Sequence, residues 1–434
     1  MTHPNEFSKW AGLITLVVML FLLHEAHAID PWEKSNRQKQ QHGQLEVTLW
    51  NPRIVALSDI GEARWGYHQF PTISRLPDGQ LLATWNAGPD RDDSYGRPGP
   101  ACVSSDAGFT WVEHKPEESL LSVSHSPVSE VGDGEFLCIP MSTALDIRRN
   151  KIQLPPVAGT MNVYGELASY RLAECGPVAQ KFMTDIPATR WKPDSKRWVR
   201  ETVSWETGQA LARIRKSEFV MTRPYIDNRI LRVGDRLLYP AYHLNYLLPD
   251  GTVPKNYSCW CMASDDNGRS WQRHGLIAYD RTGEMIMAEP CLLQTGSTGL
   301  ACIIRCSDQR QQPMLITYSD DGGKTWEQPQ HLFDYGVMPQ AVLLGNEVAV
   351  VSFGRPGIQL LFSPDGSARE WTKPLSVIAG DRNRIEAHSC GYTSLLPLDD
   401  KSFLLAYSDF EHDVGDGRTA KAILVRKISV TRKP

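Results

Sequence analysis

Three eight-residue stretches of this chain repeat one pattern, Ser-x-Asp-x-Gly-x-Ser/Thr-Trp. They lie at 104–111, 264–271 and 319–326, and a weaker copy runs over 363–371. A pattern that recurs along a chain marks the unit of a repeated architecture, in which each unit packs against its neighbours. The repeat therefore constrains the fold before any single residue is given a role.

Each copy has the residues of a tight hairpin turn. The Asp carboxylate can accept hydrogen bonds from backbone N–H groups, and Gly takes a positive φ without strain. The Trp side chain is large and apolar, so it can pack beneath the turn. We interpret the repeats as hairpins that stabilise the fold, and we do not consider their residues candidates for catalysis.

A second repeat supports the first. A turn followed by an apolar strand occurs six times, at 78–85, 133–140, 234–242, 298–305, 345–353 and 399–407. Runs of this kind bounded by Gly and Asp are hairpin signals. Six hairpins, four of them followed by the Asp motif, predict an all-β fold, a six-bladed β-propeller with four-stranded blades around a central channel.

The spacing of the hairpins also predicts the extent of the domain. We expect the propeller to occupy residues 45–434, with an insertion at about 146–222 that is partly helical over 204–216. The segment 45–57 is expected to supply the closing strand of the last blade; the alternative is that 417–430 closes it alone.

The N-terminus predicts a signal peptide over residues 1–28. Lys9 precedes an apolar run over 11–23, and Ala26-His-Ala28 matches the small-x-small cleavage pattern. We expect a secreted or periplasmic protein; an uncleaved membrane anchor is the alternative. The nine Cys are an odd number, so at least one thiol is free or paired between chains, and the others form disulfides or serve as buried apolar residues.

The repeats and several residues at predicted strand ends resemble the sialidase family, the retaining exo-α-sialidases with Asp-box propellers, over about residues 67–409. The family nucleophile is a Tyr just before the inner strand of the last blade, and Tyr392 matches it in a Gly-Tyr-Thr-Ser-Leu context. The family pairs a Glu in the fourth blade with an Arg about sixteen positions later. Glu289 and Arg305 match this pair.

Two further family positions find counterparts. The last family Arg follows the second strand of the fifth blade, where Arg355 lies. The family acid/base Asp lies in the loop after the second strand of the first blade, where Asp93 fits best, with Asp92 and Asp90 close behind.

The resemblance implies a definite chemistry. Glu289 would take the proton of Tyr392 as the phenol attacks, because a phenol with a pKa near 10 is a poor nucleophile at neutral pH. Asp93 would protonate the leaving oxygen and later activate water. Arg305 and Arg355 would clamp the substrate carboxylate through charge-assisted hydrogen bonds. A neutral Tyr suits such a substrate because it avoids like-charge repulsion.

One position departs from the family. Where sialidases carry the first Arg of the clamp in an Arg-Ile-Pro motif, this chain has Gln69-Phe-Pro, preceded by His68. An amide in place of a charged donor weakens carboxylate binding by about 1–3 kcal/mol. Either Arg64, Arg75 or Arg223 completes the clamp, or the substrate is not sialic acid.

The sequence therefore predicts an exo-acting glycoside hydrolase of sialidase type that releases a terminal acidic sugar from glycans. Tyr392, Glu289 and Asp93 are the catalytic candidates; the substrate-binding candidates are Arg305, Arg355, Gln69, His68 and His243. The alternatives are a hydrolase or lyase for another sugar and a non-catalytic glycan-binding propeller. No cofactor or metal site is predicted. The formal net charge of −4 argues against a nucleic-acid partner, and we expect a monomer without a membrane contact after signal cleavage.

Overall fold

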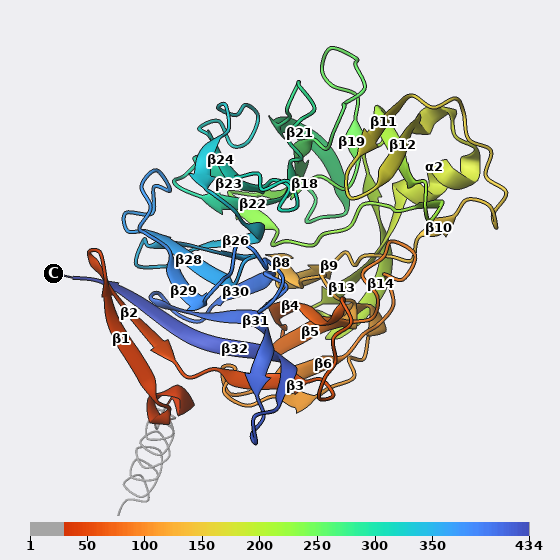
Figure 1. Ribbon diagram of the computed structural model, residues 1–434. Helices are drawn as coiled ribbons and strands as arrows, with labels where there is room; N and C mark the ends of the chain where they lie inside the picture. The colour runs from red at the N-terminus through yellow and green to blue at the C-terminus, as the bar shows by residue number, and fades with distance from the viewer. Residues whose placement is uncertain (1–29, 434) are drawn as a thin grey trace, which may run out of the picture.

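The computed structural model describes residues 30–433, so the predicted signal peptide lies outside the described residues. Strands dominate the chain, and the fold class is all-β as predicted (Figure 1). The only α-helix in this range is α2 (Pro177–Thr184), and η1 (Pro31–Lys34), η2 (Ser119–Ser122) and η3 (Leu172–Glu174) are short 3-10 turns. None of the helices in residues 30–433 has the length and apolar character needed to cross a bilayer.

Three four-stranded antiparallel sheets have the order expected for propeller blades. Their strands run in sequence order from the inner to the outer edge. The first contains β4 (Tyr67–Arg75), β5 (Leu81–Ala87), β6 (Ala101–Ser104) and β7 (Val112–Glu113). The second contains β22 (Ala288–Gln294), β23 (Leu300–Arg305), β24 (Met314–Ser319) and β25 (Gln330–Phe333). The third contains β26 (Val337–Leu343), β27 (Ala349–Gly354), β28 (Ile358–Ser363) and β29 (Leu375–Ile378).

An eight-stranded sheet joins two further four-stranded units. One unit contains β8 (Ser129–Gly132), β9 (Glu135–Cys138), β13 (Asp185–Lys192) and β14 (Arg197–Trp205). The other contains β17 (Leu231–Val233), β18 (Arg236–Ala241), β20 (Cys259–Ser264) and β21 (Ser270–Ala278). A short parallel pairing of β14 with β21 links them. Because two units share one sheet, the predicted number of six separate blades stays a prediction.

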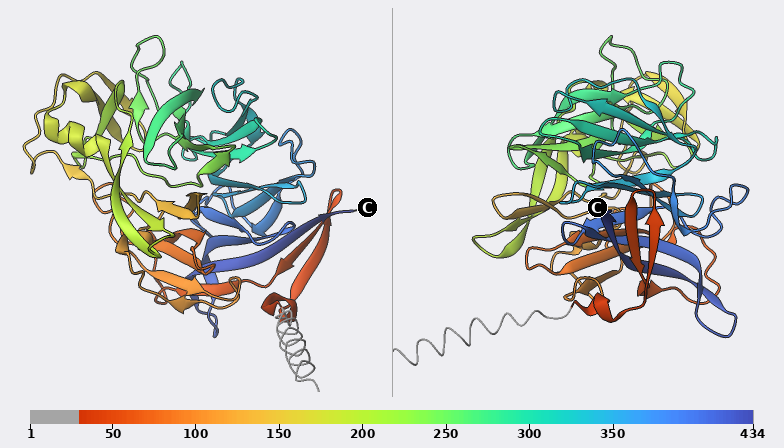
Figure 2. Two further views of the ribbon diagram at one scale, coloured as in Figure 1. Left: turned by 180° about the vertical axis from the view of Figure 1, so that it is seen from behind. Right: turned by 90° about the vertical axis from the view of Figure 1, so that its left-hand side faces the viewer.

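The two ends of the described chain meet in one sheet. Strands β30 (Thr393–Pro397), β31 (Ser402–Asp413) and β32 (Thr419–Arg432) form its inner part. Strands β2 (Leu45–Trp50) and β3 (Arg53–Leu57) both pair with β32, and β1 (Arg37–His42) pairs with β2. The expectation that 45–57 closes the last sheet is confirmed, and Figures 1 and 2 show the β1–β2 hairpin beside the end of β32.

The predicted insertion contains a small sheet of its own. Its strands are β10 (Leu145–Asp146), β11 (Gly159–Asn162), β12 (Glu166–Arg171), β15 (Ala210–Arg215) and β16 (Val220–Met221), joined by β19 (Asn245–Tyr246). In both figures this part lies on the opposite side of the molecule from the β1–β2 hairpin. Strands β13 and β14, although within 146–222, belong to the eight-stranded sheet. The helix expected over 204–216 is wrong, because this segment forms the end of β14 and all of β15.

The central strands of the sheets are buried on both faces, which explains their nearly continuous apolar sequences. All six residues of β23 and of β27 are buried. Side chains such as Ile303 and Phe353 fill the space between the β22–β25 and β26–β29 sheets. The inner strands follow one another around an axis, since β22 contacts β26, β26 contacts β30, and β30 contacts β4. Their ends on one side of this ring therefore converge.

The Asp motifs form hairpins, as predicted. The Asp266 carboxylate accepts hydrogen bonds from the Ser264 hydroxyl (2.7 Å) and from the hydroxyl (2.6 Å) and backbone N–H (2.9 Å) of Ser270. Gly268 has a φ of 80°, and a Cβ there would lie 2.5 Å from Leu137. The buried Trp271 packs beneath the turn. These contacts lie within one turn, so each motif stabilises its own hairpin. None of the described motif residues lies at the converging strand ends.

All nine cysteines lie within residues 30–433, where each is buried and none forms a disulfide. The same residues contain no group of three His, Cys, Asp or Glu side chains arranged to hold a metal ion.

Candidate active site

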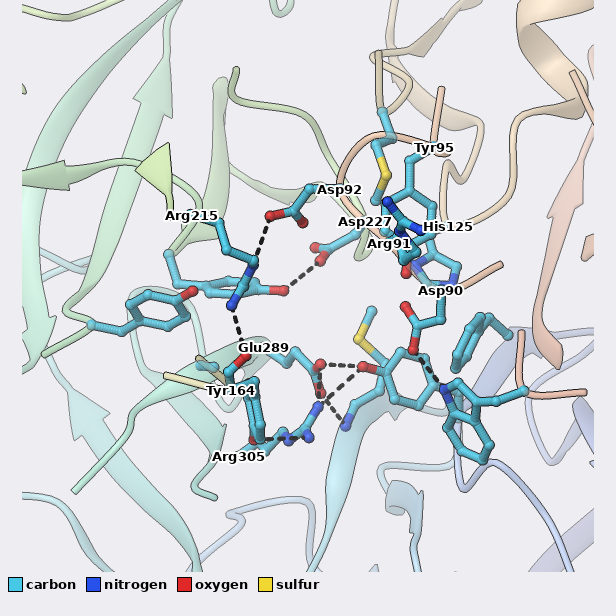
Figure 3. Close-up of a pocket in the computed structure, with 18 of the residues that line it drawn as sticks. Asp90, Arg91, Asp92, Tyr95, His125, Tyr164, Arg215, Asp227, Glu289 and Arg305 are labelled. Carbon is cyan, nitrogen blue, oxygen red and sulfur yellow. Dashed lines mark hydrogen bonds and ion pairs between the residues drawn. The ribbon is translucent and has the colours of Figure 1, made fainter. Parts of the chain in front are cut away.

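A pocket of about 390 Å³ opens where the inner strands converge (Figure 3). Its lining comes from four of the sheets, from the loop after β5 and from the insertion. Aromatic side chains such as Phe70, Tyr225 and Tyr392 alternate with charged ones such as Glu289 and Arg305. A cavity of this volume lined by aromatic groups and a few convergent polar groups is typical of a small-ligand site.

Tyr392, Glu289 and Arg305 contact one another in this pocket. The Tyr392 hydroxyl donates a hydrogen bond to Oε1 of Glu289, and the same oxygen accepts from Nη1 of Arg305. Arg305 Nη1 also lies 3.0 Å from the Tyr392 oxygen. Figure 3 shows the paired Glu289 and Arg305 side chains. The other carboxylate oxygen of Glu289 accepts from the backbone N–H of Met338 at 2.7 Å, so the carboxylate is held in one orientation.

This environment keeps the phenol neutral. Burial raises the pKa of Tyr392 well above its usual value of 10, and the neighbouring Glu289 carboxylate raises it further. Tyr392 is therefore protonated at neutral pH, and its proton already points at a carboxylate that can accept it. Such a contact between a hydroxyl and a base is the arrangement of an activated nucleophile.

Bulges in three inner strands turn side chains into the pocket. The register of β4, β22 and β26 shifts near the same end of each strand. Phe70, Glu289 and Met338 lie at these bulges with φ values of 55°, 43° and 39°. A non-glycine residue with positive φ is uncommon and costs energy, and such residues cluster at functional sites. All three side chains line the pocket.

Arg305 and Arg355 come together as predicted, but they share a partner that the sequence did not indicate. The Asp308 carboxylate lies between them, with Oδ1 2.7 Å from Nη2 of Arg305 and Oδ2 2.9 Å from Nη1 of Arg355. Tyr164, from the turn between β11 and β12, donates to the same Oδ1 at 3.1 Å and accepts from Arg305 at 3.0 Å. The insertion thus covers the arginine pair.

We expect Asp308 to give the protein an acid-sensitive contribution to stability. Burial alone would raise the pKa of Asp308, but Arg305 and Arg355 outweigh it and hold the pKa well below the usual 3.8. A carboxyl group with a lowered pKa in the folded state stabilises the protein above its unfolded pKa, and this contribution is lost as pH falls through the folded value. In urea unfolding series, Asp308→Asn should be less stable than the wild type at pH 7, and the difference should shrink below about pH 4. A difference that stays constant down to pH 2 would contradict this linkage.

The structure separates the three acidic residues of the loop after β5. Asp93 is not among the described residues that line the pocket; its side chain is 39% exposed and pairs with Arg91 at 2.6 Å. Asp90 and Asp92 do line the pocket. Asp92 forms an ion pair with Arg215 at 3.1 Å, and Asp90 accepts from the Trp65 indole at 2.7 Å. The choice of Asp93 over its two neighbours is therefore not supported by its position.

His243 is not among the described residues that line this pocket; it lines a smaller adjoining cavity that shares Tyr225 and Tyr242 with the pocket. Its Nε2 is 3.1 Å from Oδ2 of Asp227, and its ring stacks on Tyr225 at a centroid distance of 3.8 Å. Burial would raise the pKa of Asp227, but His243 and the Tyr239 hydroxyl outweigh it and leave this pKa below 3.8. His243 thus orients Asp227, which lines the pocket.

His125 lines the pocket beside Tyr392, at a ring-centroid distance of 5.6 Å. Burial lowers its pKa below the usual 6.5, against the opposing effect of Asp90 and Asp227. His125 is therefore a neutral imidazole at pH 7. It packs edge-on against Phe70 at 4.7 Å, so these aromatic rings form one wall next to the phenol.

Comparison with known proteins places this geometry in a known fold. Residues 186–366 match the BNR repeat-like domain, and this range includes two of the Asp motifs. The NanB sialidase of Streptococcus pneumoniae, solved as its K499G mutant, superposes with a TM-score of 0.52 at 12% identity, over 88% of this chain and 71% of that one. The protein has a sialidase-like fold with BNR repeats.

Two other structures share the sialidase-like fold. A protein of unknown function from Dyadobacter fermentans has a TM-score of 0.58 at 16% identity, over 88% of this chain and 99% of that one. The α-L-arabinofuranosidase of Fusarium graminearum, with an iminosugar inhibitor, has a TM-score of 0.50 at 15% identity, over 87% of this chain and 98% of that one. The comparison with curated proteins returned no match.

Within the sialidase-like fold, Gln69 and His68 do not reach the pocket. Gln69 is fully buried, and within residues 30–433 its amide oxygen and nitrogen have no hydrogen-bond partner. His68 is half-buried and packs near Trp85. The bulge in β4 presents Phe70 to the pocket instead. The expectation that Gln69 and His68 bind substrate is therefore not supported by their positions.

The three arginines considered as replacements also lie elsewhere. Arg64 pairs with Glu62, Arg75 bonds to the Pro397 carbonyl at 3.3 Å, and none of the three lines the pocket. Arg223 donates to the Asp185 carbonyl at 2.7 Å. Arg215, which the sequence did not single out, lines the pocket from β15.

Sequence reasoning missed Asp308, Asp227, His125 and Tyr164. Asp308 follows Arg305 by three residues, so the short spacing in the sequence already placed a carboxylate next to this arginine. The others come from segments between predicted strands, where no repeat sets a register. Only the folded chain brings these segments to the pocket.

Proposed function

We propose that this protein is a glycoside hydrolase that removes a terminal sugar with retention of anomeric configuration. The observation that carries the proposal is the contact of the Tyr392 hydroxyl with Glu289, with Arg305 bonded to both. A neutral phenol with its proton directed at a buried carboxylate is the arrangement of a nucleophile beside its general base. The sialidase and arabinofuranosidase that share the fold support the assignment to glycosidases.

In the first step the Tyr392 oxygen attacks the anomeric carbon, and its proton passes to Glu289. The bond from that carbon to the leaving oxygen breaks, and the leaving oxygen takes a proton from an acidic side chain of the pocket. In the second step water attacks the same carbon, gives its proton to the acid/base group and breaks the bond to Tyr392. Glu289 returns the proton to the phenolate. Two inversions at one carbon give net retention.

Asp90 is the best placed acid/base group. It lines the pocket, and among residues 30–433 its carboxylate has one hydrogen-bond partner, the Trp65 indole. Asp92 is engaged by the Arg215 guanidinium. An acid/base group has to exchange a proton with the leaving oxygen and with water, so a carboxylate with one fixed oxygen and no cationic partner suits the role.

A panel of aryl glycosides of both anomeric configurations, followed by NMR of the first-formed sugar, tests the proposal. We expect turnover of at least one terminal glycoside and a product with the configuration of the substrate. Asp90→Asn should lower kcat/KM on a poor leaving group by about 10²–10⁴-fold and much less on a nitrophenyl leaving group. An inverted product would exclude the covalent route. An unsaturated product absorbing in the near ultraviolet would show elimination, and binding without turnover would indicate a lectin-like propeller.

A further inference from the structure

The arginine pair of this pocket carries its own counter-ion. The Asp308 side chain is only 2% exposed and bonds to both Arg305 and Arg355. Each of its two oxygens faces a different guanidinium. A carboxylate held between two arginines has the binding mode that Arg offers to a bound organic acid.

Both Nη atoms of Arg305 and Nη1 of Arg355 are bonded within the protein, so among the described residues Nη2 of Arg355 is the one Nη atom of the pair without a hydrogen bond. Arg305 gives Nη1 to Glu289 and Tyr392, and Nη2 to Tyr164 and Asp308. Arg355 gives Nε to the Cys390 carbonyl at 3.1 Å and Nη1 to Asp308.

The charge of the pocket also disfavours a negatively charged ligand. Two buried carboxylates balance the two buried arginines: Glu289, which lines the pocket, and Asp308, which is not among the described lining residues. Glu386 lies 3.9 Å from Arg355. Among the residues that line the pocket, carboxylates outnumber guanidiniums by six to four. A negatively charged sugar would enter a pocket with an excess of negative charge, where the arginine pair keeps one unbonded Nη atom instead of a two-arginine clamp. Like charges brought together in a partly buried site repel more strongly than in water.

We infer that Asp308 takes the place of a substrate carboxylate, and that the pocket selects a terminal sugar without a carboxylate at the reacting carbon. This inference rests on the proposed glycosidase function of the same pocket. It makes Asp308 a specificity-determining residue and replaces the acidic sugar predicted from the sequence by a neutral one. The neutral Tyr392 nucleophile is compatible with this, because it adds no further negative charge to an acidic pocket before attack.

A matched pair of ligands tests the inference. Methyl α-N-acetylneuraminoside and its methyl ester differ only in the charge of the carboxyl group. Calorimetric titration should show no preference of the wild type for the acid over the ester. In Asp308→Ala the two arginines lose their counter-ion, so the acid should bind at least about tenfold more tightly than the ester, as for a recovered charge-assisted pair.

Two further variants test whether the change in the affinity ratio comes from the Asp308 carboxylate. Asp308→Asn keeps the shape of the side chain and serves under the same criterion if the alanine variant does not fold. Glu135→Ala removes the partner of Arg190, Lys192 and Arg269 in a different buried cluster, and it should leave the ratio of the two affinities unchanged. A tenfold preference of the wild type for the acid would overturn the inference, as would a ratio unchanged in the Asp308 variants.

The glycoside panel separates failure of this inference from failure of the proposed function. Turnover of neutral glycosides and not of sialosides supports both. Turnover of a sialoside by the wild type leaves the hydrolase in place and overturns the selection of neutral sugars. If no glycoside is turned over, the hydrolase proposal fails, and the ratio of acid to ester affinity still decides what Asp308 does.

Discussion

Replacing Tyr392 by Phe is expected to lower kcat on an aryl glycoside by at least about 10³-fold, since loss of a covalent nucleophile is among the largest single effects in enzymes. The change removes one oxygen and keeps the ring that packs against Phe70 at 4.7 Å. The measurement is the initial rate of nitrophenol release by a substrate identified in the glycoside panel. Affinity for a non-hydrolysable analogue should change little, because the pocket keeps its shape.

Tyr318→Phe is the matched control for this variant. Tyr318 donates one hydrogen bond, to the Ala368 carbonyl at 2.8 Å, and lies in the core away from the pocket. Its loss should leave kcat within about twofold of the wild type, since a remote change affects stability rather than transition-state binding. If Tyr392→Phe retains wild-type kcat while remaining folded, the nucleophile is another group and the proposed mechanism is wrong.

Replacing Arg305 by Ala is expected to reduce the free energy of unfolding by about 3–5 kcal/mol, because removal of one partner leaves the other charges buried without compensation. Arg305 contacts both Glu289 and Asp308, and all three side chains are at most 6% exposed. The measurement is urea unfolding at pH 7, followed by Trp fluorescence. Activity should fall as well, since Glu289 and Tyr392 lose a shared donor.

Arg369→Ala is the control for this effect. Arg369 forms an ion pair with Glu327 at 2.8 Å, but both side chains are at least 40% exposed. An exposed pair contributes only about 0–1 kcal/mol, because water screens it. If the two arginine variants lose equal stability, the pocket cluster is not the tightly coupled unit that its geometry indicates.

Repeat register explains why part of the candidate site could be predicted. Glu289, Arg305, Arg355 and Tyr392 are distant in sequence but lie at or next to the ends of the strands β22, β23, β27 and β30. Each hairpin repeat shows where its strands end in the sequence. In a ring of sheets, the strand ends on one side converge. The structure brings all four to one pocket.

The residues that were misplaced from the sequence lie where the hairpin spacing does not fix the direction of a side chain. A bulge adds a residue to one strand and reverses which side chains face the pocket, so Phe70 points inward and Gln69 is buried. In the loop after β5 no hydrogen-bond ladder fixes a direction, and neighbours in sequence diverge. Asp90 reaches the pocket from this loop, whereas Asp93 pairs with Arg91 outside it.

The sequence by itself determined the sialidase-like all-β fold and the strand ends that carry the nucleophile candidate and its partners. These features follow from local turn chemistry and from strand periodicity, which are written in short stretches of residues. Only the tertiary structure decided that Asp308 bonds to both Arg305 and Arg355, that Tyr164 bonds to Arg305 and Asp308, and that Asp90 lines the pocket of Tyr392. The balance of charge in the pocket depends on distances between side chains that are far apart in the sequence. The bulges and the insertion set those distances.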